Sequence, residues 1–97
     1  MVLEIAEFTA VEGRPEELRA GLLRGIEVIR RAEGCRSAQA RRCVEQPGRF
    51  ILTIEWATLE HHTVAFRGGP FFAEYRSHIT GLFVEPVVVR HYELMEP

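Results

Sequence analysis

Histidine is the side chain best suited to proton transfer near neutral pH, and this 97-residue chain has four: His61, His62, His78 and His91. His61 and His62 are adjacent, and neighbouring side chains on a helix diverge by about 100°. They therefore cannot share one pocket, and a metal pair on a helix needs i,i+4 spacing, so we expect no metal site. His62 lies three residues after Leu59 and four before Phe66, which favours an inward position for His62 alone.

His62 and His91 are the two candidate catalytic bases. His91 lies in an apolar C-terminal segment with Val87 and Val89 on the same face, so it could point into a pocket or into a subunit interface. We interpret His78 as a histidine on the surface of a helix. A purely structural role remains an alternative for His62, His78 and His91.

Aromatic and cationic side chains near these histidines are candidates for substrate binding. The Trp56 ring could stack on a flat ligand, although core packing explains a tryptophan at this position equally well. Tyr75 offers a phenolic donor and Arg76 a positive charge for an anion, unless Arg76 pairs with a nearby glutamate. Phe66 and Phe72 complete the predicted substrate-binding set.

Composition narrows the class of protein. The chain is 46% hydrophobic and 27% charged, with a net charge of -2 and a pI near 6.1, which predicts one globular domain over residues 1–97 and no nucleic-acid partner. We expect no membrane-spanning segment and no signal peptide. Cys35 and Cys43 match no metal or redox spacing, so we predict reduced thiols in a cytoplasmic protein.

The first half of the chain predicts a strand, a helix and a hairpin. Residues 2–10 suit a strand, and Pro15 suits the first turn of a helix that ends before Gly34. Apolar residues recur in this helix at spacings of three and four: Leu18, Leu22, Ile26 and Ile29. Strands at 36–46 and 50–56 then flank a turn at Pro47 and Gly48.

The second half of the chain predicts two helical segments and a closing strand. Thr58 is a plausible N-cap for a helix over 59–66, and the sequence RGGP breaks this helix. A helical pattern resumes over 71–83, where Phe72, Tyr75, Ile79 and Phe83 recur, and a strand follows over 87–95.

The order β-α-β-β-α-β predicts an α+β, ferredoxin-like fold: a four-stranded antiparallel sheet with both helices on one face. The strands carry apolar residues on both faces, and a bare apolar sheet face usually marks an interface. We therefore predict a homodimer formed through the second sheet face.

The chain resembles the antibiotic biosynthesis monooxygenase (ABM) domain of the dimeric α+β barrel superfamily. The residues that carry the resemblance are EGRPEELRAGL, EGCRSAQARRCVEQPGRFILTIEWATLEHH, FRGGPFFAEYR and VVRHYE. The resemblance implies a homodimeric barrel with one pocket per protomer, between sheet and helices. It also implies a monooxygenase that oxidises phenols or quinols with O2 and needs no cofactor.

Related members of that superfamily degrade haem with an Asn on the first strand, a Trp closing the third and a His on the second helix. Trp56 matches this pattern, but the first strand has no Asn, and the helix position falls at Ala65 or Phe66. Haem degradation is therefore disfavoured.

Three hypotheses remain after this comparison. The first is an enzyme with His62 or His91 as base, acting on a small aromatic or quinol-like substrate and O2. The second is a non-catalytic dimeric barrel that binds a small ligand. The third is haem binding without degradation. Whether the protein is an enzyme at all stays open at this point.

Overall fold

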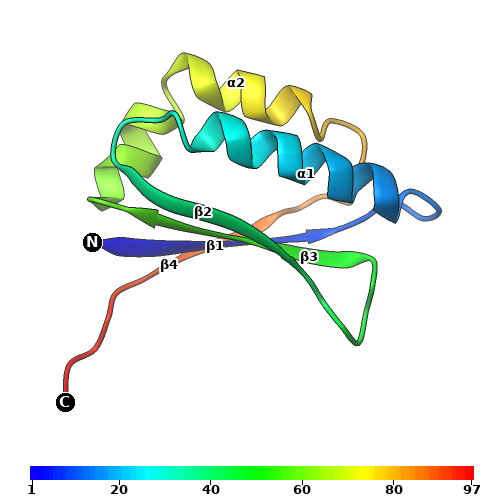
Figure 1. The fold of residues 1–97 in the computed structure, drawn as a ribbon, viewed down its shortest axis with the longest axis horizontal. Coiled ribbons are helices and arrows are strands. Elements are labelled where there is room, and N and C mark those ends of the chain that lie inside the picture. The colour runs from blue at the N-terminus through cyan, green and yellow to red at the C-terminus, as the bar shows by residue number, and fades with distance from the viewer.

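The computed structural model describes residues 1–97, and its helices all lie on one face of a four-stranded antiparallel sheet (Figure 1). In chain order the elements are β1 (Val2–Thr9), α1 (Pro15–Ile29), β2 (Cys35–Arg42), β3 (Arg49–Trp56), the π-helix η1 (His61–Phe66), α2 (Pro70–Ser77) and β4 (Val88–Tyr92). The strand order is β2-β3-β1-β4. This confirms the predicted ferredoxin-like βαββαβ fold.

Strict alternation in the two central strands gives the sheet a buried face toward the helices. Phe50, Leu52, Ile54 and Trp56 of β3 are all buried, whereas the residues between them are only half-buried. Because successive side chains of a strand point to opposite faces, β1 shows the same alternation. Its buried residues are Glu4, Ala6 and Phe8.

Helix α1 packs closely against the segment that ends α2 and the turn after it. The predicted apolar stripe is confirmed, with Leu18, Leu22, Ile26 and Ile29 all buried. A Cβ built on Gly21 would lie 2.3 Å from the carbonyl oxygen of His78, and one on Gly25 would lie 2.8 Å from Tyr75 Cδ1. The absence of side chains at these two positions allows the two helices to approach.

The boundaries of several elements differ from the sequence prediction. The segment expected as an α-helix over 59–66 is mainly π-helical, with the amide of Arg67 donating to the carbonyl of His62 five residues earlier. Thr58 does cap this segment, since its Oγ1 accepts the backbone N–H of His61 at 3.2 Å.

The helix predicted over 71–83 is shorter than the periodicity suggested. Helix α2 ends at Ser77, and turns follow to Gly81, which has φ +79°. Ile79 and Phe83 are nevertheless buried, so the apolar spacing reported their burial and not the length of the helix.

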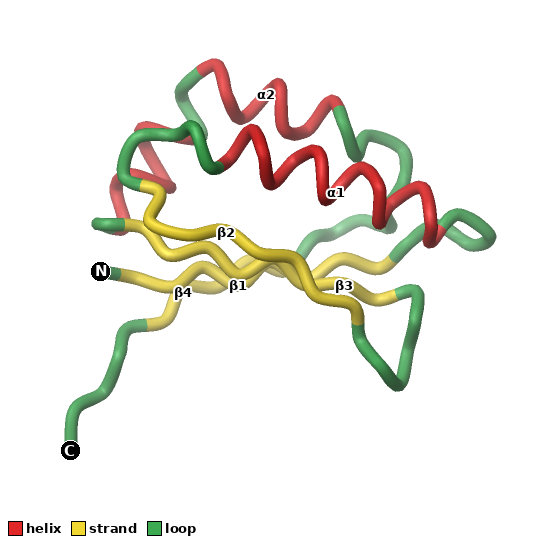
Figure 2. The backbone as a smooth tube through the Cα atoms, in the orientation of Figure 1, coloured by secondary structure: helices red, strands yellow, loops and turns green.

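The outer strands are also shorter than predicted. Strand β2 ends at Arg42 instead of Gln46, and β4 ends at Tyr92 instead of Met95. Beyond β4 the tail runs away from the sheet (Figure 2), and Leu94 and Met95 are more than four-fifths exposed. After β2, the Cys43 N–H still donates to the Arg49 carbonyl at 2.8 Å, but the chain then turns, and the Arg49 N–H donates to the Gln46 carbonyl.

The second face of the sheet carries no helix (Figure 1). Leu3, Ile5 and Ile51 lie on it half-buried, beside polar pairs such as Arg90 with Glu7 at 3.2 Å. The face is therefore mixed along the two middle strands: Leu3, Ile5 and Ile51 are apolar, whereas Glu7, Thr53 and Glu55 are polar.

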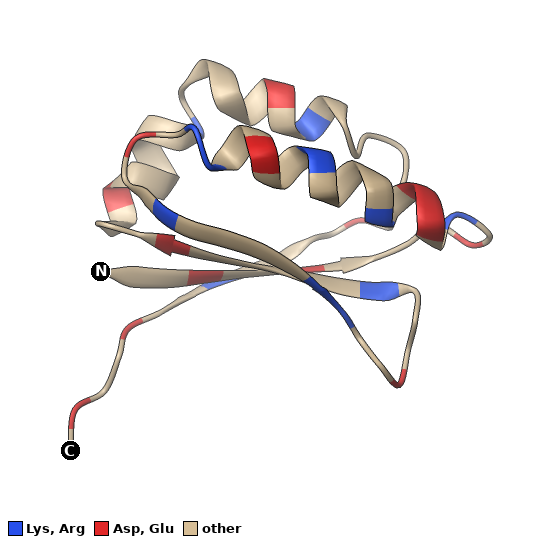
Figure 3. Ribbon diagram, in the orientation of Figure 1, with Lys and Arg blue, Asp and Glu red and all other residues tan.

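Charges of both signs are interspersed over helices and strands (Figure 3). No helix in the structure combines the length and the low charge that crossing a bilayer requires.

The contact of α1 with the turn after α2 gives a first testable prediction. We expect Gly21→Ala to destabilise the protein by about 1–3 kcal/mol, because its Cβ must displace a backbone carbonyl in a packed interface. Chemical denaturation followed by circular dichroism measures this change. Gly48→Ala is the matched control, since nothing lies within 4 Å of its Cβ position; equal stabilities for the two variants would contradict the packing argument.

Candidate functional site

A cavity of about 330 Å³ lies between the buried face of the sheet and the helices. Its size falls at the lower end of the range for small-molecule sites. Most of its wall is apolar or aromatic: Ala6, Phe8, Ile29, Ile54, Phe66, Phe72, Tyr75, Pro86, Val87 and Val89. The remaining wall residues are ionisable: Glu4, His62, Arg67, Arg76 and Glu85.

A buried carboxylate forms the centre of the ionisable part. Glu4 lies on β1, and its Oε1 accepts a hydrogen bond from Trp56 Nε1 at 2.9 Å. His62 Nε2 lies 3.3 Å from the same oxygen. Glu4 and His62 are only 5% and 3% exposed, so each is nearly removed from water and needs polar partners inside the protein.

His91 extends this pair toward the protein surface. In the pairing of β1 with β4, His91 stands opposite Glu4. Its Nε2 lies 2.7 Å from His62 Nδ1, so the two rings share one hydrogen bond. His91 does not line the cavity but a separate surface depression that includes Ala57 and Tyr92. The Glu4–His62–His91 chain therefore connects the cavity to a different part of the surface.

Trp56 packs against the Glu4–His62–His91 cluster. Its ring is fully buried and stacks on the His62 ring, with 5.4 Å between centroids and 11° between planes. It does not border the cavity, so the predicted stacking of a ligand on Trp56 is not supported by this placement. In the structure its stacking partner is His62, and its N–H is used by Glu4.

Burial sets the protonation of the cluster. Loss of hydration, followed by the positive charges of Arg67 and His91, lowers the pKa of His62 to about 4. Burial also lowers the pKa of His91, and Arg67 adds to this effect. Burial raises the pKa of Glu4, against the opposing effects of the Trp56 hydrogen bond and of Arg67. His62 is thus a neutral imidazole at pH 7.

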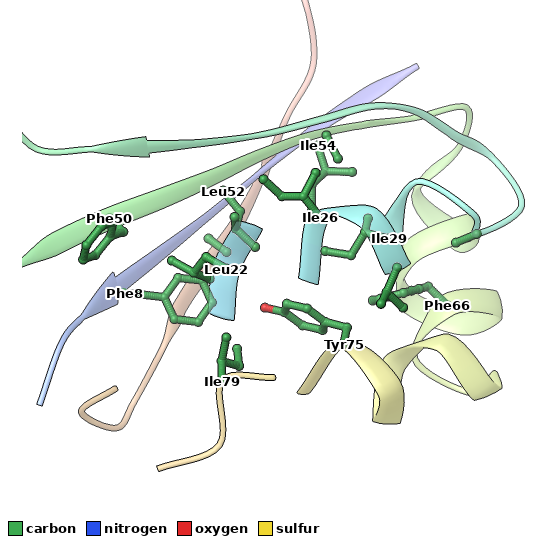
Figure 4. Close-up of a cluster of buried hydrophobic side chains, with 14 of the residues drawn as sticks. Phe8, Leu22, Ile26, Ile29, Phe50, Leu52, Ile54, Phe66, Tyr75 and Ile79 are labelled. Atoms are coloured by element: carbon green, nitrogen blue, oxygen red, sulfur yellow. The ribbon is translucent and has the colours of Figure 1, made fainter. Parts of the chain in front are cut away.

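Tyr75 faces the cavity from α2. The close-up in Figure 4 shows its ring pointing away from α2 into the cluster around Phe8 and Leu22. Burial raises the pKa of the Tyr75 phenol, and the nearby charge of Glu4 raises it further. The side chain is therefore a neutral hydrogen-bond donor in a largely apolar wall.

Two arginines border the same cavity. Arg76 lies over Phe72 and Phe83, with its Cζ 5.7 Å and 5.2 Å from the ring centroids. Its Nε is buried without a partner, and its nearest carboxylate, Glu85, is 3.9 Å away. Arg67 forms no ion pair. Both guanidinium groups retain donors that an anionic ligand could use.

The structure brings most of the predicted site residues to one place. His62, Tyr75, Arg76, Phe66 and Phe72 all line the cavity. His91 reaches it only through His62, and Trp56 lies behind the wall.

The other two histidines lie elsewhere. His61 bonds to Thr58 Oγ1 through Nδ1 at 2.8 Å, and its ring packs on Gly34. His78 belongs to the turn that contacts Gly21. Neither lines the cavity.

The sequence interpretation missed Glu4 and left Arg67 out of the predicted substrate-binding set. A signal for Glu4 was present: it shares a strand face with Ala6 and Phe8, and a carboxylate on a buried face needs a specific partner. Arg67 follows directly after the inward-facing Phe66, at the break between η1 and α2. The structure contains no group of three or more His, Cys, Asp or Glu arranged to hold a metal ion.

These features define a class of protein: a ferredoxin-like α+β domain with an internal cavity and a buried acid–imidazole cluster on its wall. The sequence profile of the ABM family, antibiotic biosynthesis monooxygenase, matches residues 1–77. The chain belongs to this family.

Solved and curated relatives agree with that assignment. A candidate antibiotic biosynthesis monooxygenase from Bordetella bronchiseptica is 32% identical, with a TM-score of 0.91 over 98% of this chain and 97% of that one. The uncharacterised protein YczJ of Bacillus subtilis is 27% identical over 93 residues, which is 96% of this chain and 98% of YczJ. SnoaB, a cofactor-independent oxygenase from Streptomyces nogalater, has a TM-score of 0.82 over 99% and 94% of the two chains; at 16% identity it shows the fold alone.

The lowered pKa of His62 predicts how stability depends on pH. Between about pH 4 and pH 6.5 the unfolded chain binds a proton at His62 that the native protein excludes. Acidification through this window therefore reduces the contribution of His62 to stability, by roughly 3 kcal/mol in total. The raised pKa of Glu4 acts in the opposite sense above pH 4.5.

We expect the stability advantage of the wild type over His62→Gln to shrink as the pH falls from 6.5 to 4. Urea denaturation at several pH values measures it. His61→Gln is the matched control and should stay parallel to the wild type. A constant difference between wild type and His62→Gln would contradict the burial of a neutral His62.

Proposed function

We propose that the protein is a cofactor-independent monooxygenase that oxidises a small aromatic or quinol-type substrate with O2 inside the cavity. The observation that carries this proposal is the Glu4–His62–His91 chain, of which Glu4 and His62 are buried on the wall of a largely apolar cavity. A base of shifted pKa in a site that excludes water is what such chemistry needs from a protein, because the substrate itself supplies the electrons. Family membership supports the same activity.

The reaction balances without a further reductant. A base removes a proton from an activated C–H of the substrate, and the electron pair left on carbon is transferred to O2. A C–O bond forms, a second proton leaves carbon, and the O–O bond breaks. A CH2 group thereby becomes a carbonyl, and the other oxygen atom leaves as water. The four electrons accepted by O2 all come from the substrate.

The cavity wall supplies groups for the remaining tasks. The neutral Tyr75 phenol and the Arg76 guanidinium, assisted by Arg67, would stabilise negative charge that develops on a substrate oxygen. Phe66 and Phe72 would hold the aromatic part of the substrate; their ring centroids lie 5.7 Å apart at 89°. Trp56 would act on substrate only indirectly, by holding Glu4 and His62 in place.

His62 and His91 are both proposed to handle protons in this reaction. His62 lines the cavity, whereas His91 bonds to His62 and lines the surface depression. A cytoplasmic location remains a prediction from the sequence.

Oxygen uptake tests the proposed activity. With an anthrone-type or quinol-type compound we expect aerobic uptake that His62→Gln lowers at least about tenfold. An oxygen electrode measures it, and His61→Gln should match the wild type because His61 lies outside the cavity. Equal uptake in wild type and His62→Gln would contradict the role of the cluster. Saturable binding of the compounds without any uptake would favour the alternative, a non-catalytic ligand-binding protein.

We also propose a homodimer formed through the helix-free face of the sheet. Leu3, Ile5 and Ile51 lie half-buried on this face, and a partner sheet would cover them.

Size-exclusion chromatography with light scattering tests the proposed dimer. We expect a dimer at micromolar concentration, and we expect Ile5→Arg to raise its dissociation constant by at least about tenfold, since it would bury an unpaired charge. Val44→Arg is the control, because Val44 is 87% exposed in a loop. A monomeric wild type would refute the proposed dimer.

A further inference from the structure

The two oxygens of the Glu4 carboxyl group have different surroundings. Oε1 accepts the Trp56 N–H and faces His62 Nε2. Oε2 has no polar partner in the protein, yet the buried unpartnered side-chain atoms are Arg42 Nε and Arg76 Nε only. Oε2 therefore has accessible surface, and because Glu4 lines the cavity, that surface opens there.

Both ring nitrogens of His62, unlike Oε2 of Glu4, face a polar group of the protein. Nε2 faces Glu4 Oε1 at 3.3 Å, and Nδ1 shares a hydrogen bond with His91 Nε2 at 2.7 Å. An imidazole has only these two sites for a proton. His62 thus has no free nitrogen for a ligand, although its ring borders the cavity.

We propose that Glu4, through Oε2, is the group that takes a proton from a ligand in the cavity, and that His62 and His91 connect this carboxyl group to solvent. The proposal deepens the proposed function, because it names the catalytic base of that same site. Trp56 and His62 are then positioning residues: both hold Oε1, which leaves Oε2 directed at the ligand.

The connection matters because a ligand that fills the cavity removes water from Oε2. The imidazole chain is then the remaining polar link between the carboxyl group and solvent. The proton taken up on Oε2 reaches His62 after the carboxyl group turns about its Cγ–Cδ bond and brings the protonated oxygen to His62 Nε2. His62 Nε2 then gains this proton as His62 Nδ1 gives its own to His91 Nε2, and His91 Nδ1 gives its own to water. Rotation of the two rings restores the starting tautomers before the next passage. Glu4 is left as a carboxylate, and His91, which is half-buried in its surface depression, exchanges with solvent.

The charges around the Glu4–His62–His91 cluster favour Glu4 as the base. The positive charge of Arg67 opposes the rise in the pKa of Glu4 and lowers the pKa of both histidines. It therefore stabilises a carboxylate beside two neutral imidazoles, which is the state that can accept a proton from a ligand. Tyr75, on the opposite wall, stays protonated and serves as a donor.

Hydrogen–deuterium exchange under argon tests the base separately from the oxygenation. An anthrone-type probe in D2O without O2 should exchange its activated C–H hydrogens for deuterium when the wild-type protein is present, as measured by NMR or mass spectrometry. We expect Glu4→Gln, which keeps the side-chain shape and an acceptor oxygen, to lower this exchange by about a hundredfold or more. Glu7→Gln, on the opposite face of the same strand, should exchange like the wild type.

The same assay tests the connection to solvent. We expect His91→Ala to slow deuterium incorporation, because the abstracted proton returns to carbon before solvent replaces it. Added imidazole should restore the rate, and imidazoles of different pKa should restore it to different degrees, which a purely structural role of His91 would not produce.

Each outcome decides one part of the proposal. Exchange at the wild-type rate in Glu4→Gln overturns Glu4 as the base, and an unaffected His91→Ala, or one that imidazole does not rescue, overturns the connection. If Glu4→Gln does not fold, the ¹³C shift of the Glu4 carboxyl group in wild-type protein decides: it should move when the probe binds under argon, and an unchanged shift overturns the proposal. Exchange without oxygen uptake would uphold the base while refuting the monooxygenase.

Discussion

The interaction between the Glu4 carboxyl group and the His62 imidazole is the constraint on which the site depends. Neither side chain has appreciable access to bulk water, and a buried ionisable group without a partner is costly. The Trp56 N–H and His91 complete the arrangement. Four elements, β1, β3, η1 and β4, must therefore be in place together before the site exists.

The local backbone explains how these elements can meet. Antiparallel pairing sets His91 opposite Glu4 across β1 and β4, and the end of β3 carries Trp56 to the same face. The π-helix η1 then directs both His62 and Phe66 inward. Such π segments are rare and are frequently found at functional sites. Here the segment holds a polar and an apolar wall residue of one cavity.

The two faces of the sheet carry different kinds of residues. Its helix-covered face holds the cavity and the acid–imidazole cluster, whereas its bare face carries the apolar residues proposed to bind a second copy. The two sets alternate along the same strands: Glu4 and Ala6 point to the cavity, and Leu3 and Ile5 point away from it. A substitution at one of these positions can therefore affect either activity or dimerisation while the strand itself remains.

Local physical chemistry in the sequence was sufficient for the fold and for much of the candidate site. Alternation in β3, the apolar stripe of α1 and the turn residues determined the order of the elements, because each depends on near neighbours in the chain. The inward position of His62 followed from its spacing to Phe66. The lengths of α2, β2 and β4 did not follow, since packing and strand pairing end them.

Only the tertiary structure decided which side chains share a hydrogen bond. The Trp56 bond to Glu4 joins residues 52 positions apart, and the bond between His62 and His91 joins residues 29 apart. No local pattern encodes such contacts; they arise because strand register and helix packing set distant residues side by side. For the same reason the sequence left open whether Trp56 stacks on a ligand or packs in the core, whereas in the folded chain its ring stacks on His62 and its N–H bonds to Glu4.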